Sequence, residues 1–96
     1  MLTVEGIKRA IRPICEKYGV KRLFLFGSYA RNEATEKSDV DFRIDRGALR
    51  GFAFGGFYGD IEETLSVPID LLTTEQMRPD FLNRIKKEEI LLYEKP

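Results

Sequence analysis

Residues 39–45 constrain the fold more than any other stretch, because polar and apolar side chains alternate there without a break. The polar members are Asp39, Asp41, Arg43 and Asp45, and the apolar members are Val40, Phe42 and Ile44. Successive side chains of a β-strand point to opposite faces, so this stretch predicts a strand with one face in a hydrophobic core. The other face then gathers carboxylates beside a guanidinium.

Shorter apolar runs predict further strands at residues 21–26, 69–72 and 90–93, the last of them at a sheet edge. Apolar residues at helical spacing predict helices at residues 3–18, 51–65 and 79–87. In the first helix we expect Thr3 as the N-cap, Gly19 as the end, and a kink or a division into two pieces at Pro13. A short turn capped by Thr73 or Thr74 should follow the third strand.

Helices and strands mix along the whole chain, which predicts the α/β (α+β) class. We expect a small mixed β-sheet of three to four strands, covered by helices on one face. Residues 1–96 are enough for a single domain with one modest core. The first two strands are joined by about a dozen residues, which excludes a tight hairpin and leaves parallel and antiparallel pairing open.

The composition removes several classes of chemistry. There is no histidine and only one cysteine, Cys15, which excludes Ser–His and Cys–His triads, histidine general bases and an internal disulfide. The 16 acidic and 16 basic residues balance, which argues weakly against direct binding of nucleic acid. No apolar stretch approaches the roughly 20 residues of a membrane span. We expect a cytoplasmic protein, and any catalysis by it must depend on carboxylates, Lys, Arg, hydroxyls and bound metal.

Asp39 and Asp41 would lie side by side on one strand face, where two carboxylates repel each other unless a cation or a proton lies between them. Their oxygen atoms suit Mg²⁺. Asp70 interrupts the apolar strand at 69–72, and it would join the pair if that strand lies beside 39–45. Three aspartates can hold two metal ions. Each of these features alone more often has a structural role than a functional one. Their occurrence together favours a metal site.

Gly27 and Ser28 follow the first strand, where a glycine lets the backbone approach a ligand closely. Free N–H groups and the Ser28 hydroxyl in such a turn favour phosphate oxygens. The P-loop pattern is absent. The turn therefore predicts a phosphate-binding site of another kind.

Residues 25–31, Leu-Phe-Gly-Ser-Tyr-Ala-Arg, followed by Ser-Asp-Val-Asp at 38–41, resemble the G-S-x10-D-x-D signature of the nucleotidyltransferase superfamily, which has the DNA polymerase β-like fold. The lead-in at 17–28, the ending at 91–94 and the small size resemble its minimal nucleotidyltransferases. The resemblance covers nearly the whole chain. It implies that Gly27 and Ser28 hold a triphosphate.

The same resemblance implies that Asp39 and Asp41 are catalytic residues that bind Mg²⁺, with Asp70 as a third metal ligand or the general base. Two arginines are further candidates for nucleotide binding. Arg31 either reaches a phosphate or forms a salt bridge with Glu33. Arg43 either binds a phosphate or pairs with one of the aspartates of its own strand, where relatives often carry an apolar residue.

In the resembling family, the partner is a HEPN-domain ribonuclease toxin. The resemblance implies an antitoxin that transfers AMP from ATP to a tyrosine of that toxin, with Mg²⁺ as the cofactor and a hetero-oligomeric complex. One alternative is a catalytically weak or inactive antitoxin that neutralises the toxin by binding. A less favoured alternative is a small-molecule nucleotidyltransferase that modifies an antibiotic, since such enzymes usually carry a further domain for the acceptor.

Overall fold

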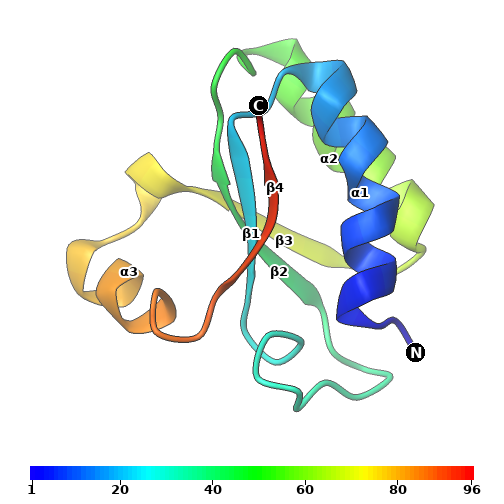
Figure 1. Cartoon of the computed structure of the whole chain (residues 1–96), viewed down its shortest axis with the longest axis vertical. Coiled ribbons are helices and arrows are strands. Elements are labelled where there is room, and N and C mark those ends of the chain that lie inside the picture. The colour runs from blue at the N-terminus through cyan, green and yellow to red at the C-terminus, as the bar shows by residue number, and fades with distance from the viewer.

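The computed structural model describes all residues from 1 to 96, and it consists of a four-stranded β-sheet with helices on both faces (Figure 1). The elements in chain order are α1 (Val4–Tyr18), β1 (Arg22–Phe26), β2 (Val40–Asp45), α2 (Phe52–Leu65), β3 (Ile69–Thr73), the 3₁₀ turn η1 (Thr74–Gln76), α3 (Pro79–Ile85) and β4 (Ile90–Glu94). The predicted class, a small mixed sheet with helices, is confirmed. No helix is both long and apolar enough to pass through a lipid bilayer.

The strand order is β3-β2-β1-β4. β1 pairs antiparallel with both β2 and β4, whereas β2 pairs parallel with β3. The strand predicted from alternation therefore lies inside the sheet and brings Asp41 level with Asp70 on β3 and with Phe26 at the end of β1. The predicted edge strand is confirmed as β4.

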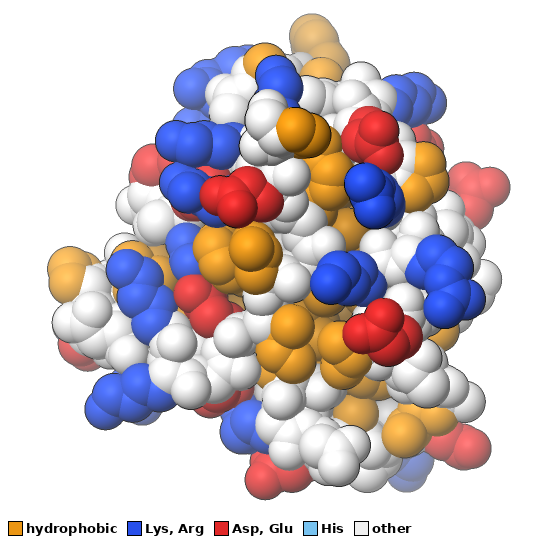
Figure 2. All heavy atoms as spheres, in the orientation of Figure 1, with side chains coloured by type: hydrophobic (Ala, Val, Ile, Leu, Met, Phe, Trp, Pro, Cys, Tyr) orange, Lys and Arg blue, Asp and Glu red, His pale blue; other side chains and the backbone are white.

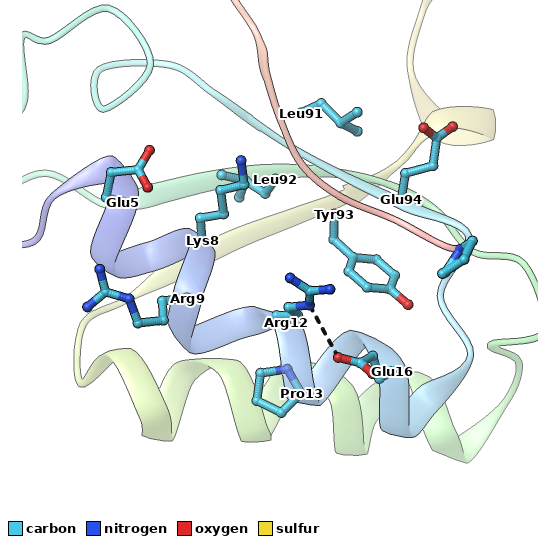
Figure 3. Close-up of a pocket in the computed structure, with 11 residues that line it drawn as sticks. Glu5, Lys8, Arg9, Arg12, Pro13, Glu16, Leu91, Leu92, Tyr93 and Glu94 are labelled. Atoms are coloured by element: carbon cyan, nitrogen blue, oxygen red, sulfur yellow. Dashed lines mark ion pairs between the residues drawn. The ribbon is translucent and has the colours of Figure 1, made fainter.

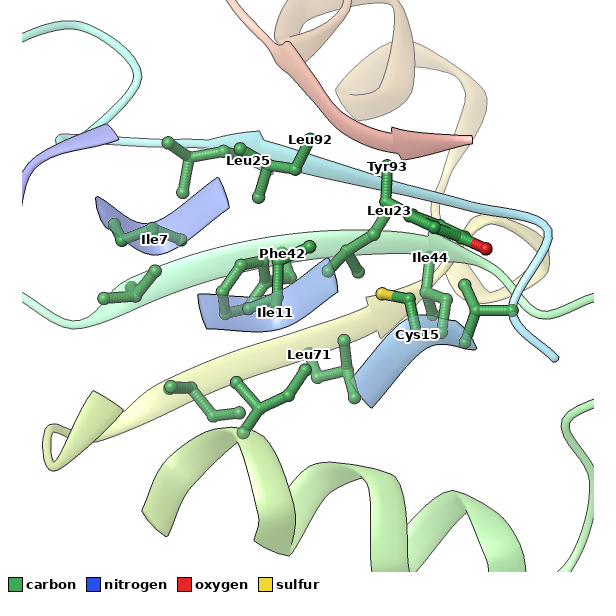
Figure 4. Close-up of a cluster of buried hydrophobic side chains, with 14 of the residues drawn as sticks. Ile7, Ile11, Cys15, Leu23, Leu25, Phe42, Ile44, Leu71, Leu92 and Tyr93 are labelled. Atoms are coloured by element: carbon green, nitrogen blue, oxygen red, sulfur yellow. The ribbon is translucent and has the colours of Figure 1, made fainter. Parts of the chain in front are cut away.

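The core lies between the sheet and the pair α1 and α2 (Figure 4). The apolar members of β2 are fully buried there together with Leu23 and Leu25 of β1. From the helices come Ile7, Ile11, Cys15, Phe57 and Ile61. Burial raises the pKa of the Cys15 thiol to about 12, and Glu16 adds to the effect, so this cysteine acts as a small core residue.

α1 begins where the sequence predicts, because the Thr3 side chain accepts a hydrogen bond of 3.0 Å from the Gly6 N–H. It ends at Gly19, whose φ of 69° is left-handed. The helix continues through Pro13, so the alternative of two separate pieces is wrong. Pro13 is exposed, and water can therefore satisfy the carbonyl that its missing N–H would have bonded.

α3 packs on the opposite face of the sheet from α1 and α2. The ring of Phe81 meets that of Phe26 edge-on, with centroids 6.0 Å apart. The expectation that helices cover only one face is therefore wrong. α3 also ends at Ile85, two residues earlier than predicted, and residues 86–88 form a turn that leads back to β4. This turn lies beside the face that carries Asp41.

Candidate active site

The chain turns sharply where β1 ends. Gly27 has a φ of 76°, and the Arg31 N–H donates to the Gly27 carbonyl at 3.1 Å. Residues 28–32 form consecutive turns. Asn32 has a φ of 60°, a left-handed conformation that asparagine tolerates better than most residues with a β-carbon. A β-carbon on Gly27 would overlap the Asp41 carboxylate, so the glycine is required twice, for its φ and for space.

Replacing Gly27 with alanine is expected to destabilise the protein by about 1–3 kcal/mol, because the left-handed backbone is strained and the new methyl group displaces Asp41. Urea unfolding measures the change. Gly55→Ala in α2 is the matched control: nothing lies within 4 Å of its added β-carbon, and it should stabilise the helix by about 1 kcal/mol. A Gly27→Ala variant as stable as the wild type would contradict this account of the turn.

Asp41 lies on the sheet face opposite the core, and Asp70 is its partner on β3. Burial raises the pKa of the Asp41 carboxyl to about 6, and the negative charges of Asp70, Asp39 and Glu88 contribute in the same direction. Arg31 acts in the opposite direction. The structure thus places Asp41 next to Asp70, as the sequence anticipated for a strand pair, and Asp41 feels the charge of Asp39.

No group of three or more acidic or cysteine side chains is gathered closely enough here to hold a metal ion. The chemistry of the donors nevertheless fits Mg²⁺, which prefers carboxylate oxygens. The adjacent aspartates repel one another, as the raised pKa of Asp41 records, and a divalent cation relieves that repulsion. Metal binding by Asp39, Asp41 and Asp70 therefore stays a proposal.

A shallow cavity of about 400 Å³ opens beside Asp41. Its lining joins the end of β1 and the following turn to α3 and the turn after α3: Phe26, Gly27, Ser28, Arg31, Asp41, Phe81, Arg84, Ile85 and Glu88. Four residues predicted from sequence thus line one cavity: Gly27, Ser28, Arg31 and Asp41. Asp39 and Asp70 are exposed and lie outside the lining.

Arg31 forms the salt bridge to Glu33 that the sequence suggested, at 2.9 Å, and a second one to Glu88, also at 2.9 Å. These carboxylates raise the pKa of the Arg31 guanidinium, chiefly through the hydrogen bond to Glu33. The side chain is exposed and lines the cavity, so a phosphate can reach it.

The structure argues against the nucleotide-binding role predicted for Arg43, because the side chain is buried and already paired. Only 5% of its side chain is exposed, and it forms a bidentate pair with Glu89, at 2.7 and 3.0 Å. Its guanidinium lies 4.0 Å from the centroid of the Phe24 ring and 3.5 Å from Asp45. The alternative of an ion pair on its own strand is correct for Asp45. The ion pair with Glu89 is the main contact of the Arg43 guanidinium, because the turn before β4, which carries Glu89, covers this part of the sheet face.

Several residues near the site were missed by sequence reasoning. Lys86 and Lys87 are exposed, whereas Glu88 and Glu89 turn inward to Gly27 and Arg43. Arg84 was also missed; it lines the cavity, stacks on Phe81, and has no acidic partner within 4 Å. No local pattern marks these residues, since their contacts depend on where α3 docks.

A larger cavity, of about 530 Å³, lies elsewhere, between α1 and β4 (Figure 3). Its charged lining includes Lys8, Arg9 and Arg12 but also Glu5 and Glu16, and Arg12 pairs with Glu16. Figure 2 likewise shows basic and acidic side chains interspersed over this face of the molecule. This cavity contains none of the predicted site residues, so the candidate active site is the smaller cavity beside Asp41.

The sequence profile of the polymerase beta nucleotidyltransferase family matches residues 9–96, and the chain therefore belongs to this family. A candidate protein adenylyltransferase of Methanocaldococcus jannaschii is 38% identical over 90 residues, which cover 93% of this chain and 97% of that protein. A solved minimal nucleotidyltransferase superposes with a TM-score of 0.79 at 26% identity, over 93% of this chain and 95% of the other.

A complex of a tri-AMPylated Shewanella oneidensis HEPN toxin with an MNT antitoxin contains a chain of the same fold. It superposes with a TM-score of 0.70 at 14% identity, over 97% of this chain and 74% of that chain. At this identity, the likeness supports the fold alone. Family membership and fold thus agree with the resemblance drawn from the G-S-x10-D-x-D residues.

Proposed function

We propose that residues 1–96 form a minimal nucleotidyltransferase that moves AMP from ATP to a tyrosine hydroxyl of a HEPN-domain toxin, and thereby act as its antitoxin. The observation that carries this proposal is the cavity where the Gly27 turn, Arg31 and Asp41 meet, with Asp70 paired beside Asp41. Phosphate-binding donors and a carboxylate pair are the two components that nucleotidyl transfer needs.

Each group in the site has a distinct task. The Ser28 hydroxyl, the Gly27 N–H and the Arg31 guanidinium donate to phosphate oxygens, and the unpaired Arg84 adds a positive charge from α3. Asp39, Asp41 and Asp70 would hold Mg²⁺, one or two ions, which when bound neutralises phosphate charge and activates the acceptor hydroxyl. Asp70 is exposed at the rim of this face, where it can also accept the proton of an incoming hydroxyl.

The relatives support the acceptor and the partner. The M. jannaschii protein is named for transfer of an adenylyl group to protein, and it matches this chain along nearly its whole length. The S. oneidensis complex pairs an antitoxin of this fold with a HEPN toxin that carries AMP. The cavity of this chain is shallow and Asp39 and Asp70 are open to solvent, which leaves room for a partner to complete the site.

Transfer of label from ATP tests the proposal. The purified chain is incubated with α-labelled ATP, Mg²⁺ and its cognate HEPN protein, and mass spectrometry locates the AMP. We expect labelled tyrosine on the HEPN protein, loss of labelling in EDTA, and no detectable labelling with the Asp39→Asn/Asp41→Asn variant. Labelling that persists undiminished in that double variant would refute the assignment of the carboxylates.

A second candidate function is neutralisation of the toxin by binding alone. It is favoured by the absence of a preformed cluster of three metal-binding carboxylates. Toxicity in cells separates the two functions, because a binding-only antitoxin with Asp39→Asn and Asp41→Asn still rescues growth, whereas an obligatory transferase does not.

A further inference from the structure

A single carboxylate oxygen already occupies two of the donors assigned to the triphosphate. Glu88 Oε2 accepts a hydrogen bond of 3.0 Å from the Gly27 N–H and another of 2.9 Å from Arg31 Nη1. Glu88 belongs to the turn between α3 and β4, 61 residues from Gly27 along the chain. A carboxylate held by a backbone N–H and a guanidinium has the same partners that a phosphate oxygen would have.

The two anions compete for the same hydrogen atoms. A backbone N–H has one hydrogen, so the Gly27 N–H cannot serve Glu88 and a phosphate fully at the same time. A Glu88 carboxylate that remained in place would also repel a triphosphate a few ångströms away. Removal of the Glu88 charge should therefore favour the nucleotide, whether the side chain leaves or stays.

The surroundings allow Glu88 to move while the turn stays in place. Its side chain is 26% exposed and makes contact through one oxygen. The next residue, Glu89, is only 9% exposed and is held by the buried Arg43. Rotation of the Glu88 side chain toward solvent leaves that anchor, and hence the backbone of the turn, undisturbed.

We propose that Glu88 is an internal competitor of the nucleotide phosphates: it occupies the Gly27 and Arg31 donors in the free protein and is displaced when a triphosphate binds. This inference rests on the proposed function, since it assumes that the cavity beside Asp41 binds ATP. The side chain thereby sets nucleotide affinity, because a ligand must carry enough negative charge on its phosphates to replace the carboxylate.

Nucleotide binding to the full chain tests the inference directly. Glu88→Gln keeps the shape and removes the charge, and Glu88→Ala removes the side chain. We expect both to bind Mg·ATP and inorganic tripolyphosphate about 5- to 20-fold more tightly than the wild type, measured by calorimetric titration. The matched control is Glu33→Gln, which removes the other anion on Arg31 but does not touch Gly27; its affinity should change less than about twofold.

The Gly27 amide resonance supplies a readout that is independent of transfer activity. In ¹⁵N-labelled protein we expect it to shift on Glu88→Ala without nucleotide, and to shift when ATP binds the wild type. A merely structural Glu88 would give weaker binding in both variants, and unchanged or weaker binding overturns the inference while leaving the proposed function intact. If ATP binds neither the wild type nor any variant, the proposed function fails and the inference fails with it.

Discussion

Replacement of Arg43 by alanine is expected to destabilise the protein by about 3–5 kcal/mol, the usual consequence of removing one partner from a buried ion pair. Glu89 would keep its negative charge in a site where its side chain is only 9% exposed. The Phe24 ring would lose the guanidinium stacked on it, and Thr74 would lose its hydrogen bond from Arg43 Nη1. Urea unfolding at pH 7 measures the loss.

Two further variants test whether the lost stability comes from burial of the ion pair or from removal of a charge in general. Arg43→Met combined with Glu89→Leu removes both charges and fills the space with apolar atoms, so most of the lost stability should return. Arg12→Ala removes one partner of the exposed pair with Glu16 and should change the free energy of unfolding by no more than about 0.5 kcal/mol. Equal losses for Arg43→Ala and Arg12→Ala would show that burial of the pair contributes nothing.

Arg43 also marks the limit of what the sequence could predict. Alternation at 39–45 correctly indicated that Val40 and Phe42 enter the core and that Arg43 lies on the polar face. It could not show what covers that face, because the partner, Glu89, comes from 46 residues further along the chain. Local periodicity identifies the polar side of a strand. Whether that side is exposed or buried is decided by the docking of a distant turn.

The residues of the candidate site fall into the same two groups: those that local patterns predict and those whose place depends on distant parts of the chain. Gly27, Ser28 and Asp41 were found because a glycine turn after a strand and a carboxylate on an alternating strand are local signals. Asp70 was predicted as the third carboxylate on the condition that its strand lies beside residues 39–45, and the pairing of β3 with β2 meets that condition. Arg84 and Glu88 enter the site through the packing of Phe81 on Phe26, a contact between elements far apart in sequence.

Asp41→Asn is expected to make the protein more stable at pH 8 while lowering adenylyl transfer by about 10³-fold or more. The pKa of Asp41 in the folded protein is raised to about 6 from its ordinary value of 3.8, mainly by burial and then by Asp70 and Asp39. Folding therefore favours the protonated carboxyl. In the wild type, this preference contributes to the free energy of unfolding in full below about pH 4, and the contribution is lost as the pH rises through about 6.

Asparagine cannot ionise, so the Asp41→Asn variant avoids this loss. The difference in pKa corresponds to at most about 3 kcal/mol at pH 8, and partial exposure of Asp41 to solvent reduces it to about 1–2 kcal/mol. Urea unfolding in EDTA at about pH 4, 6 and 8 should show the variant gaining on the wild type as the pH rises. A constant difference across this range would mean that Asp41 does not titrate there.

Asp45 is the matched control on the same strand. Burial opposes its charge, but hydrogen bonds from Thr74 and Arg22, together with the positive charges of Arg43 and Arg22, lower the pKa of its carboxyl. Asp45→Asn should therefore destabilise the protein at pH 8, with the difference fading as the pH falls below about 4. Added Mg²⁺ provides a further test of Asp41. It should raise the stability of the wild type at pH 8 and leave that of Asp41→Asn unchanged, because a cation relieves repulsion only where the carboxylates are charged. Opposite effects of Asp41→Asn and Asp45→Asn on the free energy of unfolding at pH 8 would show that Asp45 is held in place for structure and that Asp41 is kept unpaired for a ligand.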